Sequence, residues 1–302
     1  MKVLIIGGSG HVSGTLANAA LTAGHEVHTI TRGQRALPDG VHAITVDRKD
    51  HNATAFAIAN LDTKWDLVVD CICYGLEDIQ QDIELFKERA KQFVLISTDF
   101  VYDPEKRQFP QSVDNAQYCD LDSNMTYGIN KRLCELELIN EDTGDMQWTV
   151  LRPGHIYGPT SQLGCLPLHS RDTELIAKMK AGTPLELVGG GHFLQQPILA
   201  TDLAACILSV YGNSKIAGQI YNVTGPDIIA SKRYYEIIAD ILGVDLTIEE
   251  VHVAEYMAAH PDHLPFLCHR IYDITVMKDS GLHVPATSIE DGLRIHVEGL
   301  DS

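Results

Sequence analysis

The chain begins with MKVLIIGGSGHVSG, residues 1–14. Four apolar residues at positions 3–6 have the composition of a buried strand, and a glycine-rich string follows them directly. Glycine lets the backbone turn tightly and approach a pyrophosphate that rests on the N-terminus of the next helix. The order of strand, glycine loop and helix therefore predicts dinucleotide binding rather than a merely tight turn. The residues expected to contact the cofactor here are Gly7, Gly10, His11, Val12 and Ser13.

Short apolar runs alternate with longer amphipathic segments along the chain. The first helix should cover residues 13–23 and end at Gly24, because glycine tolerates the left-handed turn that ends helices. Such alternation is typical of an α/β protein with a Rossmann-type, doubly wound parallel sheet. The strands expected in this sheet are residues 3–6, 27–30, 43–46, 67–71, 93–96, 148–151 and 219–223.

Two further helices, at 163–182 and 232–242, lie outside the regular alternation and predict a smaller lobe. We expect a dinucleotide-binding domain at residues 1–152, to which residues 196–225 return. The remaining segments, 153–195 and 226–302, would form a discontinuous C-terminal substrate-binding lobe.

Composition excludes several classes of function. The 302 residues include 41 acidic and 23 basic ones, and this net charge of -18 repels polyanions, so no nucleic-acid partner is expected. Seven cysteines without paired spacing predict buried free thiols and no metal site. The apolar run at the start is too short for a signal peptide or a membrane span, which predicts a cytoplasmic protein with no membrane partner.

The second expected strand ends in Thr31-Arg32-Gly33, without the carboxylate that holds the ribose hydroxyls in NAD-specific proteins. A guanidinium can pair with the 2′-phosphate of NADP, and Arg35 could add a second charge. The alternative is that both arginines are solvated loop charges. Arg32 thus favours NADP as the cofactor, with NAD possible.

Two other strand ends face the expected cofactor site. Asp47 could accept a hydrogen bond from the adenine amino group, or could cap the following helix. At the end of the fourth strand, small side chains would let the backbone pass along the cofactor, although packing alone also explains them. The residues in question are Cys71, Ile72 and Cys73.

Tyr127 and Lys131 are four residues apart in an expected helix and therefore share one face. A phenol has a reference pKa of about 10, but an adjacent ammonium and a positive nicotinamide ring favour the phenolate. Tyr127 could then move a proton while hydride travels to or from the nicotinamide. Thr98, at the end of the fifth strand, would fix the reacting oxygen. A Tyr and a Lys at this spacing are often ordinary surface residues, but the order of the motifs favours catalysis.

With these motifs in order, the chain resembles the extended short-chain dehydrogenase/reductase family, the NAD(P)-dependent epimerase/dehydratase group, over nearly its whole length. LRPGHIYGP at 151–159 resembles the family segment that passes the nicotinamide, which implies that Pro153 contacts the cofactor. Residues 202–204 and 221–223 resemble later landmarks. The resemblance implies a tightly held cofactor, chemistry at a secondary alcohol or ketone, often on a nucleotide sugar, and a homodimer.

Departures from the family pattern narrow the expected substrate. Dehydratases carry an Asp-Glu pair after the catalytic threonine, whereas this chain has Asp99-Phe100, so the usual base is missing and Asp99 is left as an acid or a substrate contact. Gln195 and His155 stand where nucleotide-sugar enzymes usually have Arg and Asn. These losses favour a free sugar, a sugar acid or another polyhydroxy carbonyl compound. The residues expected to bind it are Tyr74, His155, His192 and Gln195, although either histidine could be structural or solvated.

The sequence therefore predicts an NAD(P)-dependent oxidoreductase or epimerase that transfers hydride at a secondary alcohol or ketone of a sugar or sugar-like molecule. A nucleotide-sugar 4-epimerase-like enzyme is one alternative. A non-catalytic or RNA-binding relative is another, because one branch of the family resembles this N-terminus. The set of Thr98, Tyr127 and Lys131 and the net charge of -18 argue against that second alternative.

Overall fold

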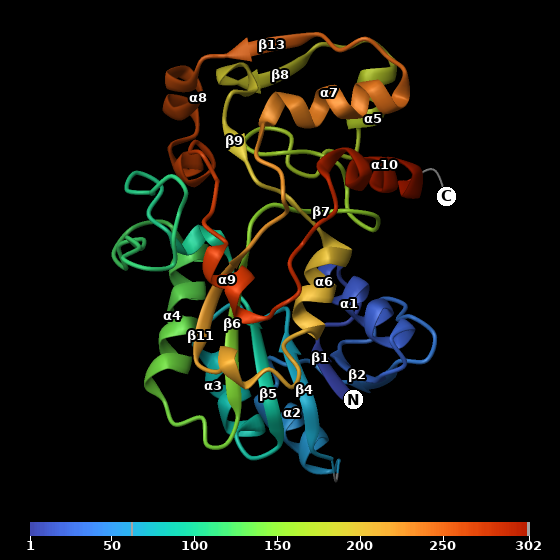
Figure 1. Ribbon diagram of the computed structural model, residues 1–302, viewed down its shortest axis with the longest axis vertical. Coiled ribbons are helices and arrows are strands. Elements are labelled where there is room, and N and C mark those ends of the chain that lie inside the picture. The colour runs from blue at the N-terminus through green and yellow to red at the C-terminus, as the bar shows by residue number, and fades with distance from the viewer. Residues whose placement is uncertain (62, 301–302) are drawn as a thin grey trace.

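The computed structural model describes residues 1–61 and 63–300 and arranges them in two lobes (Figure 1). The larger lobe is built on one seven-stranded sheet in the order β11-β6-β5-β4-β1-β2-β3, in which all neighbouring strands are parallel. Its strands are β1 (Lys2–Ile6), β2 (Glu26–Thr31), β3 (His42–Thr45), β4 (Trp65–Asp70), β5 (Ala90–Ile96), β6 (Gln147–Pro153) and β11 (Gln219–Val223). This is the expected Rossmann-type, doubly wound architecture.

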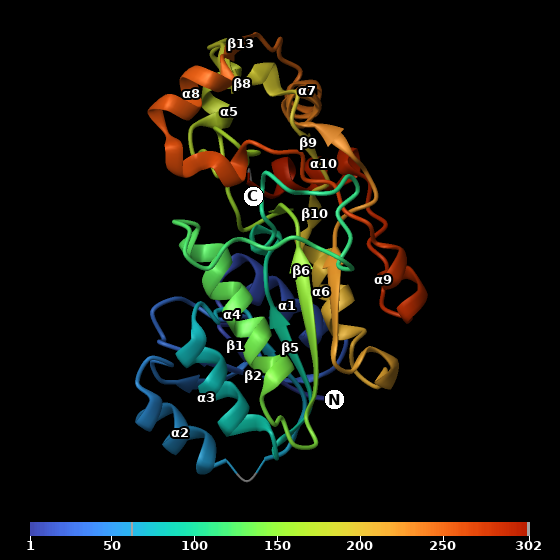
Figure 2. The same ribbon diagram turned by 90° about the vertical axis from the view of Figure 1, so that its left-hand side faces the viewer.

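Helices cover both faces of the sheet (Figure 2). On one face α1 (His11–Thr22) and α6 (Ala200–Leu208) bury residues such as Leu16 and Leu203. On the other face lie α2 (His51–Ala59), α3 (Leu76–Phe86) and α4 (Thr126–Asn140). Each buried Val, Leu or Ile side chain contributes roughly 1.5–3 kcal/mol, so the two apolar layers hold the strands in one register.

The smaller lobe has its own core, contributed by segments that are far apart in the sequence, such as Leu175, Tyr234 and Leu293. The short strands outside the seven-stranded sheet are β7 (Ile156–Tyr157), β8 (Leu185–Val188), β9 (Leu194–Gln195), β10 (Ile198–Leu199), β12 (Ile229–Ala230) and β13 (Ile248–Val251). The helices of the smaller lobe are α5 (Leu175–Lys180), α7 (Ser231–Leu242), α8 (Val253–Ala259) and α10 (Ile289–Leu300). Short 3-10 turns occur at η1 (Asp99–Val101), η2 (Gly189–Gly191), η3 (Ser214–Ile216) and η4 (Pro261–Phe266).

The structure differs from the sequence expectations at two helices. A helix was expected over residues 163–182, but the backbone is irregular up to α5, because Gly164 has a φ of 138° and Pro167 cannot continue a helix. In addition, α9 (Thr275–Ser280) does not belong to the smaller lobe. Ile274 and Met277 pack into the core beside the sheet, where α9 covers β11 (Figure 1). The expectation that residues 226–302 lie wholly in the smaller lobe is wrong for this segment.

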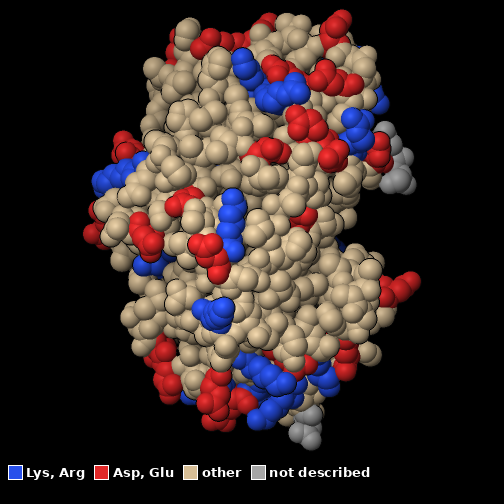
Figure 3. Space-filling model, in the orientation of Figure 1, with Lys and Arg blue, Asp and Glu red and all other residues tan. Residues whose placement is uncertain are grey.

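Parallel pairing places the carboxyl ends of all these strands at one edge of the sheet, and that edge faces the smaller lobe (Figure 1). All seven cysteines are free thiols. No helix in the described part of the chain is long and apolar enough to cross a membrane. Lys and Arg occur singly or in small groups beside Asp and Glu on the face shown in Figure 3.

Candidate active site

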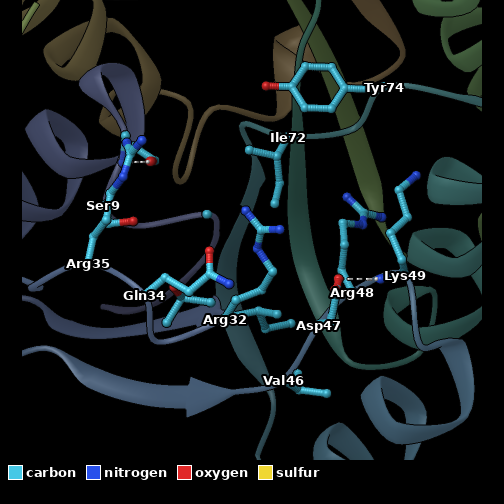
Figure 4. Close-up of a pocket in the computed structure, with 15 residues that line it drawn as sticks. Ser9, Arg32, Gln34, Arg35, Val46, Asp47, Arg48, Lys49, Ile72 and Tyr74 are labelled. Atoms are coloured by element: carbon cyan, nitrogen blue, oxygen red, sulfur yellow. Dashed lines mark hydrogen bonds between the residues drawn. The ribbon is translucent and has the colours of Figure 1, made fainter.

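A cavity of about 470 Å³ opens at the carboxyl ends of β1, β2, β3 and β4. Figure 4 shows Arg32 reaching into its middle, with Asp47 and Lys49 on one side and Ser9 and Arg35 on the other. The residues that line the cavity are Gly7, Ser9, Gly10, Ser13, Ile30, Thr31, Arg32, Gln34, Arg35, Val46, Asp47, Arg48, Lys49, Ile72 and Tyr74.

The glycine loop after β1 has no room for larger side chains. Gly7 and Gly8 have φ values of 124° and 100°, and a Cβ on Gly8 would lie 2.6 Å from Cγ2 of Thr29. Ser13, in the position of the third glycine, accepts a hydrogen bond from the backbone N–H of Gly10 at 3.0 Å. The loop therefore brings backbone N–H groups to the start of α1, a geometry that suits a pyrophosphate.

Arg32 and Arg35 supply exposed positive charge to the cavity. Neither forms an ion pair with any residue that the structure describes. Lys49, which sequence reasoning missed, lies next to them and bonds to Asp78 at 2.6 Å. The free guanidinium groups can meet a 2′-phosphate without breaking an existing contact.

Arg48 also lines the cavity, where its side chain is buried. It is not among the site residues predicted from the sequence. It is 5% exposed and pairs with Asp70, Asp78 and Asp82, which come from β4 and α3. Burial and neighbouring carboxylates raise the pKa of Asp82 well above its ordinary value. The cluster fixes the loop after β3 to α3 and so holds Asp47 and Lys49 at the cavity.

Thr98 and Tyr127 come together at the end of β5. The side chain of Thr98 lies close enough to the phenol of Tyr127 to lower the pKa of that phenol. Gly128 makes the approach possible, because a Cβ at this position would lie 2.0 Å from the carbonyl oxygen of Phe100. The first turn of α4 therefore packs directly on η1, and Tyr127 remains 49% exposed.

Lys131 is buried below Tyr127. Its Nζ donates to the carbonyl oxygen of Ile96 at 2.6 Å and lies 5.3 Å from the ring centre of Tyr74. Burial raises the pKa of Tyr127, a hydrogen bond to Thr98 and the charge of Arg171 lower it, and Asp99 raises it. The net effect raises the pKa of Tyr127 above its ordinary value, so the phenol is protonated at neutral pH.

Asp99 does not have the free carboxyl group that a catalytic acid needs. Nε and Nη2 of Arg270 donate to its two oxygens at 2.7 and 2.8 Å, and Arg107 and Tyr272 also bond to it. Burial alone would raise the pKa of Asp99, but Arg270, Arg107 and these hydrogen bonds hold it at about 2. Asp99 is thus ionised and engaged, so the expectation of an acid role is corrected by this geometry.

An ion pair between α4 and β6 fixes the helix that carries Tyr127. Arg152 donates from Nε and Nη2 to Glu135 at 2.8 and 2.7 Å, and Ser97 donates to the same carboxylate at 2.6 Å. Both charged side chains are fully buried. The pair therefore sets the position of α4 against the strand ends.

Several expected cofactor contacts lie outside the cavity lining. Nδ1 of His11 lies 3.0 Å from Oγ1 of Thr160, in the loop after β7, and burial lowers the pKa of this histidine to about 4. Cys73 is in the core, with its Sγ 3.5 Å from that of Cys134. The expected contacts that do not line the cavity are His11, Val12, Cys71, Cys73 and Pro153.

The four residues expected to bind the substrate do not lie together in one site. Tyr74 lines the cofactor cavity, and His192 is exposed after the glycine turn η2. Gln195 is fully buried on β9, beside Arg270 through a backbone bridge. Burial, with the charges of Arg270 and Arg171, lowers the pKa of His155 to about 3.

Comparison with known proteins gives the same fold and a family. Residues 3–224 match the model of the NAD dependent epimerase/dehydratase family. A chloroplast stem-loop binding protein of 41 kDa from Arabidopsis thaliana is 26% identical over 240 residues, which are 74% of this chain and 58% of that protein. The 2'-dehydrokanamycin reductase of Streptomyces kanamyceticus is 24% identical over 278 residues, 85% of this chain and 74% of that protein.

Among solved structures, the UDP-glucuronic acid 4-epimerase of Bacillus cereus, in complex with UDP-glucuronic acid and NAD, has a TM-score of 0.76 to this chain. The two are 18% identical, and the alignment covers 100% of this chain and 99% of the epimerase. At this identity the likeness shows the fold.

Proposed function

Because this chain belongs to the NAD dependent epimerase/dehydratase family, we propose that it is a hydride-transfer enzyme acting at a secondary alcohol or ketone of a small polyhydroxylated molecule. It is an enzyme of the extended short-chain dehydrogenase/reductase type. The observation that carries the proposal is the contact between Thr98 and Tyr127 at the end of β5, on the edge of the sheet where the cavity opens.

The chain's own residues would perform the proton transfer. A bound nicotinamide would supply or accept the hydride. Thr98 would hold the substrate oxygen by its hydroxyl, and Tyr127 would donate a proton to that oxygen in reduction or take it in oxidation. Lys131, at the base of the same helix face, would favour the phenolate once it turns from the carbonyl of Ile96.

We propose NADP as the preferred cofactor. The support is the pair of unpaired guanidinium groups of Arg32 and Arg35, together with the absence of a carboxylate at the end of β2. The glycine loop would suit a dinucleotide, because Gly7 and Gly10 line the cavity without side chains and backbone N–H groups lie at the start of α1.

The test is transfer of deuterium from nicotinamide-labelled NADPH to a panel of small ketoses and keto acids, followed by mass spectrometry of the product. We expect labelled alcohol from the wild type and none from Tyr127→Phe. Label in both proteins would remove Tyr127 from catalysis. A separate assay with a sugar deuterated at its carbinol carbon would identify an epimerase, if the label is kept, the configuration at that carbon is inverted and there is no net use of cofactor.

We propose that the larger lobe, with residues 196–225, binds the cofactor and that the rest of the smaller lobe binds the substrate. We also propose a homodimer formed through α3 and α4, which leave Leu76 and Ile139 exposed. Sedimentation equilibrium would detect such a dimer, and Ile139→Glu should weaken it.

RNA binding is a second candidate function, supported by the similarity to the stem-loop binding protein. This chain spans 58% of that protein, and its net charge of -18 opposes a polyanion at long range. Filter retention of a labelled RNA stem-loop that falls steeply with salt, with no deuterium transfer to any carbonyl, would favour this candidate.

A further inference from the structure

The buried side chains directly after Thr98 carry an excess of positive charge. Two guanidinium groups, those of Arg107 and Arg270, share the single carboxylate of Asp99, and Tyr272 donates a hydrogen bond to it. All four side chains are at most 8% exposed. Since arginine stays protonated in proteins, the cluster holds one unbalanced positive charge out of water.

Hydrogen-bonding groups around this cluster are also left over. Nη1 of Arg270 and both amide atoms of Gln195 are buried, and none has a hydrogen-bond partner in the part of the chain that the structure describes. Gln195 is 0% exposed and forms a backbone bridge with Arg270. Buried groups without a hydrogen-bond partner destabilise a protein, so together they indicate that a ligand completes the site.

A third arginine extends the positive region toward Tyr127. Arg171 is exposed in the loop before α5, and its charge acts on both Tyr127 and His155. Arg270 also acts on His155. Positive charge therefore acts on both Tyr127 and His155, in a protein whose net charge of -18 repels anions elsewhere.

From these contacts we propose that the substrate is a polyhydroxy acid whose carboxylate binds between Gln195 and the free Nη1 of Arg270. This inference rests on the proposed hydride-transfer function and names the class of its substrate. One carboxylate balances the single excess charge of the buried cluster. Its two oxygens can accept from Arg270 and from the Gln195 amide nitrogen, while the Gln195 amide oxygen accepts from a substrate hydroxyl. Arg171 attracts the acid at the entrance.

The experiment compares matched acids and alcohols as ligands of the purified chain saturated with NADPH. Titration calorimetry with D-gluconate and D-glucitol, and with D-erythronate and erythritol, measures binding without turnover. We expect at least one acid to bind about tenfold more tightly than its alcohol, since charge-assisted hydrogen bonds are roughly twice as strong as neutral ones. UDP-glucose is the third probe.

Two variants locate the acid preference. Gln195→Leu removes unpaired buried amide atoms, so the protein should keep or raise its Tm while the acid loses at least about fivefold in affinity. Arg171→Gln should lower the affinity for the acid and leave the affinity for the alcohol unchanged. Arg233→Gln, which changes an exposed arginine on α7, is the matched control and should change neither.

Equal binding of acid and alcohol in both pairs would overturn the proposal, as would an acid preference that survives in Gln195→Leu and Arg171→Gln. UDP-glucose binding more tightly than either acid would replace it with a nucleotide-sugar substrate. These outcomes would leave the proposed hydride transfer standing. If hydride transfer itself were wrong, the chain would not bind NADPH or would not transfer deuterium from it to any ketone.

Discussion

Nζ of Lys131 lies 2.6 Å from the carbonyl oxygen of Ile96, the last residue of β5. This bond joins the middle of α4 to the strand that ends beside Thr98. The lysine is 2% exposed, so its charge is out of water. The same side chain thus holds the helix in place and lies one turn below the phenol of Tyr127.

Lys131→Met should lower both stability and turnover. The carbonyl of Ile96 would lose its side-chain donor, a loss of about 1–3 kcal/mol, and Tyr127 would lose the cation that favours its phenolate. Urea unfolding and the rate of NADPH oxidation measure the two effects. Lys180→Met, at an exposed position at the end of α5, is the control. Unchanged turnover would contradict the catalytic role of Lys131.

Tyr127→Phe should reduce kcat by about 10²–10⁴-fold, the usual contribution of a positioned proton donor. The affinity for NADPH should change less than twofold, because the Tyr127 hydroxyl does not line the cofactor cavity. Tyr211→Phe, which removes another exposed hydroxyl far along the sequence, is the control. A fall in cofactor affinity with kcat unchanged would mean that Tyr127 binds rather than catalyses.

Arg32→Asp should shift the cofactor preference from NADP to NAD by about 1.4 kcal/mol or more, which is tenfold. The new carboxylate repels the 2′-phosphate and can accept from the ribose hydroxyls. The ratio of Kd values for NADPH and NADH measures the shift. Arg294→Asp, on the exposed side of α10, should leave this ratio unchanged. The same ratio in both variants would show that Arg32 points to solvent.

Gly128→Ala should separate Tyr127 from Thr98. The added Cβ would lie 2.0 Å from the carbonyl oxygen of Phe100, so α4 must move away from η1. We expect a lower Tm and a larger loss in kcat than in NADPH affinity. Gly75→Ala is the matched control, because no atom lies within 4 Å of its added Cβ. Equal behaviour of the two variants would show that the close approach is unimportant.

Asp99 should make stability depend on pH in the acid range. Its folded pKa of about 2 lies below the ordinary value of 3.8, so its contribution is full above about pH 4 and is lost as the pH falls through 2. The shift corresponds to about 2 kcal/mol. Asp99→Asn should be less stable than wild type at pH 7, because two buried arginines lose their carboxylate, and the difference should shrink below pH 4. Asp39→Asn, at the surface, is the control. A difference that does not vary with pH would show that Asp99 is not ionised in the folded protein.

Local sequence was sufficient for the Rossmann-type fold and for bringing Thr98 close to Tyr127. The strand, glycine loop and helix at the N-terminus are consecutive, so their geometry follows from residues that are neighbours in the chain. Arg32 and Ile72 line the cavity as expected because each follows a strand of the parallel sheet directly. Thr98 and Tyr127 also lie close together in the structure, and their joint role in catalysis stays a prediction.

Only the tertiary structure decided which charged side chains lie near Thr98 and Tyr127. Arg270 lies far from Asp99 in sequence and carries no local motif, yet it fixes that carboxylate as an ion and so excludes it as an acid. Arg48, Gln195 and α9 follow the same rule, since their environment comes from segments brought together by the fold. Pattern and spacing determine which elements form, because they are local. Burial and ion pairing determine the charge of each side chain, and these depend on neighbours that only packing supplies.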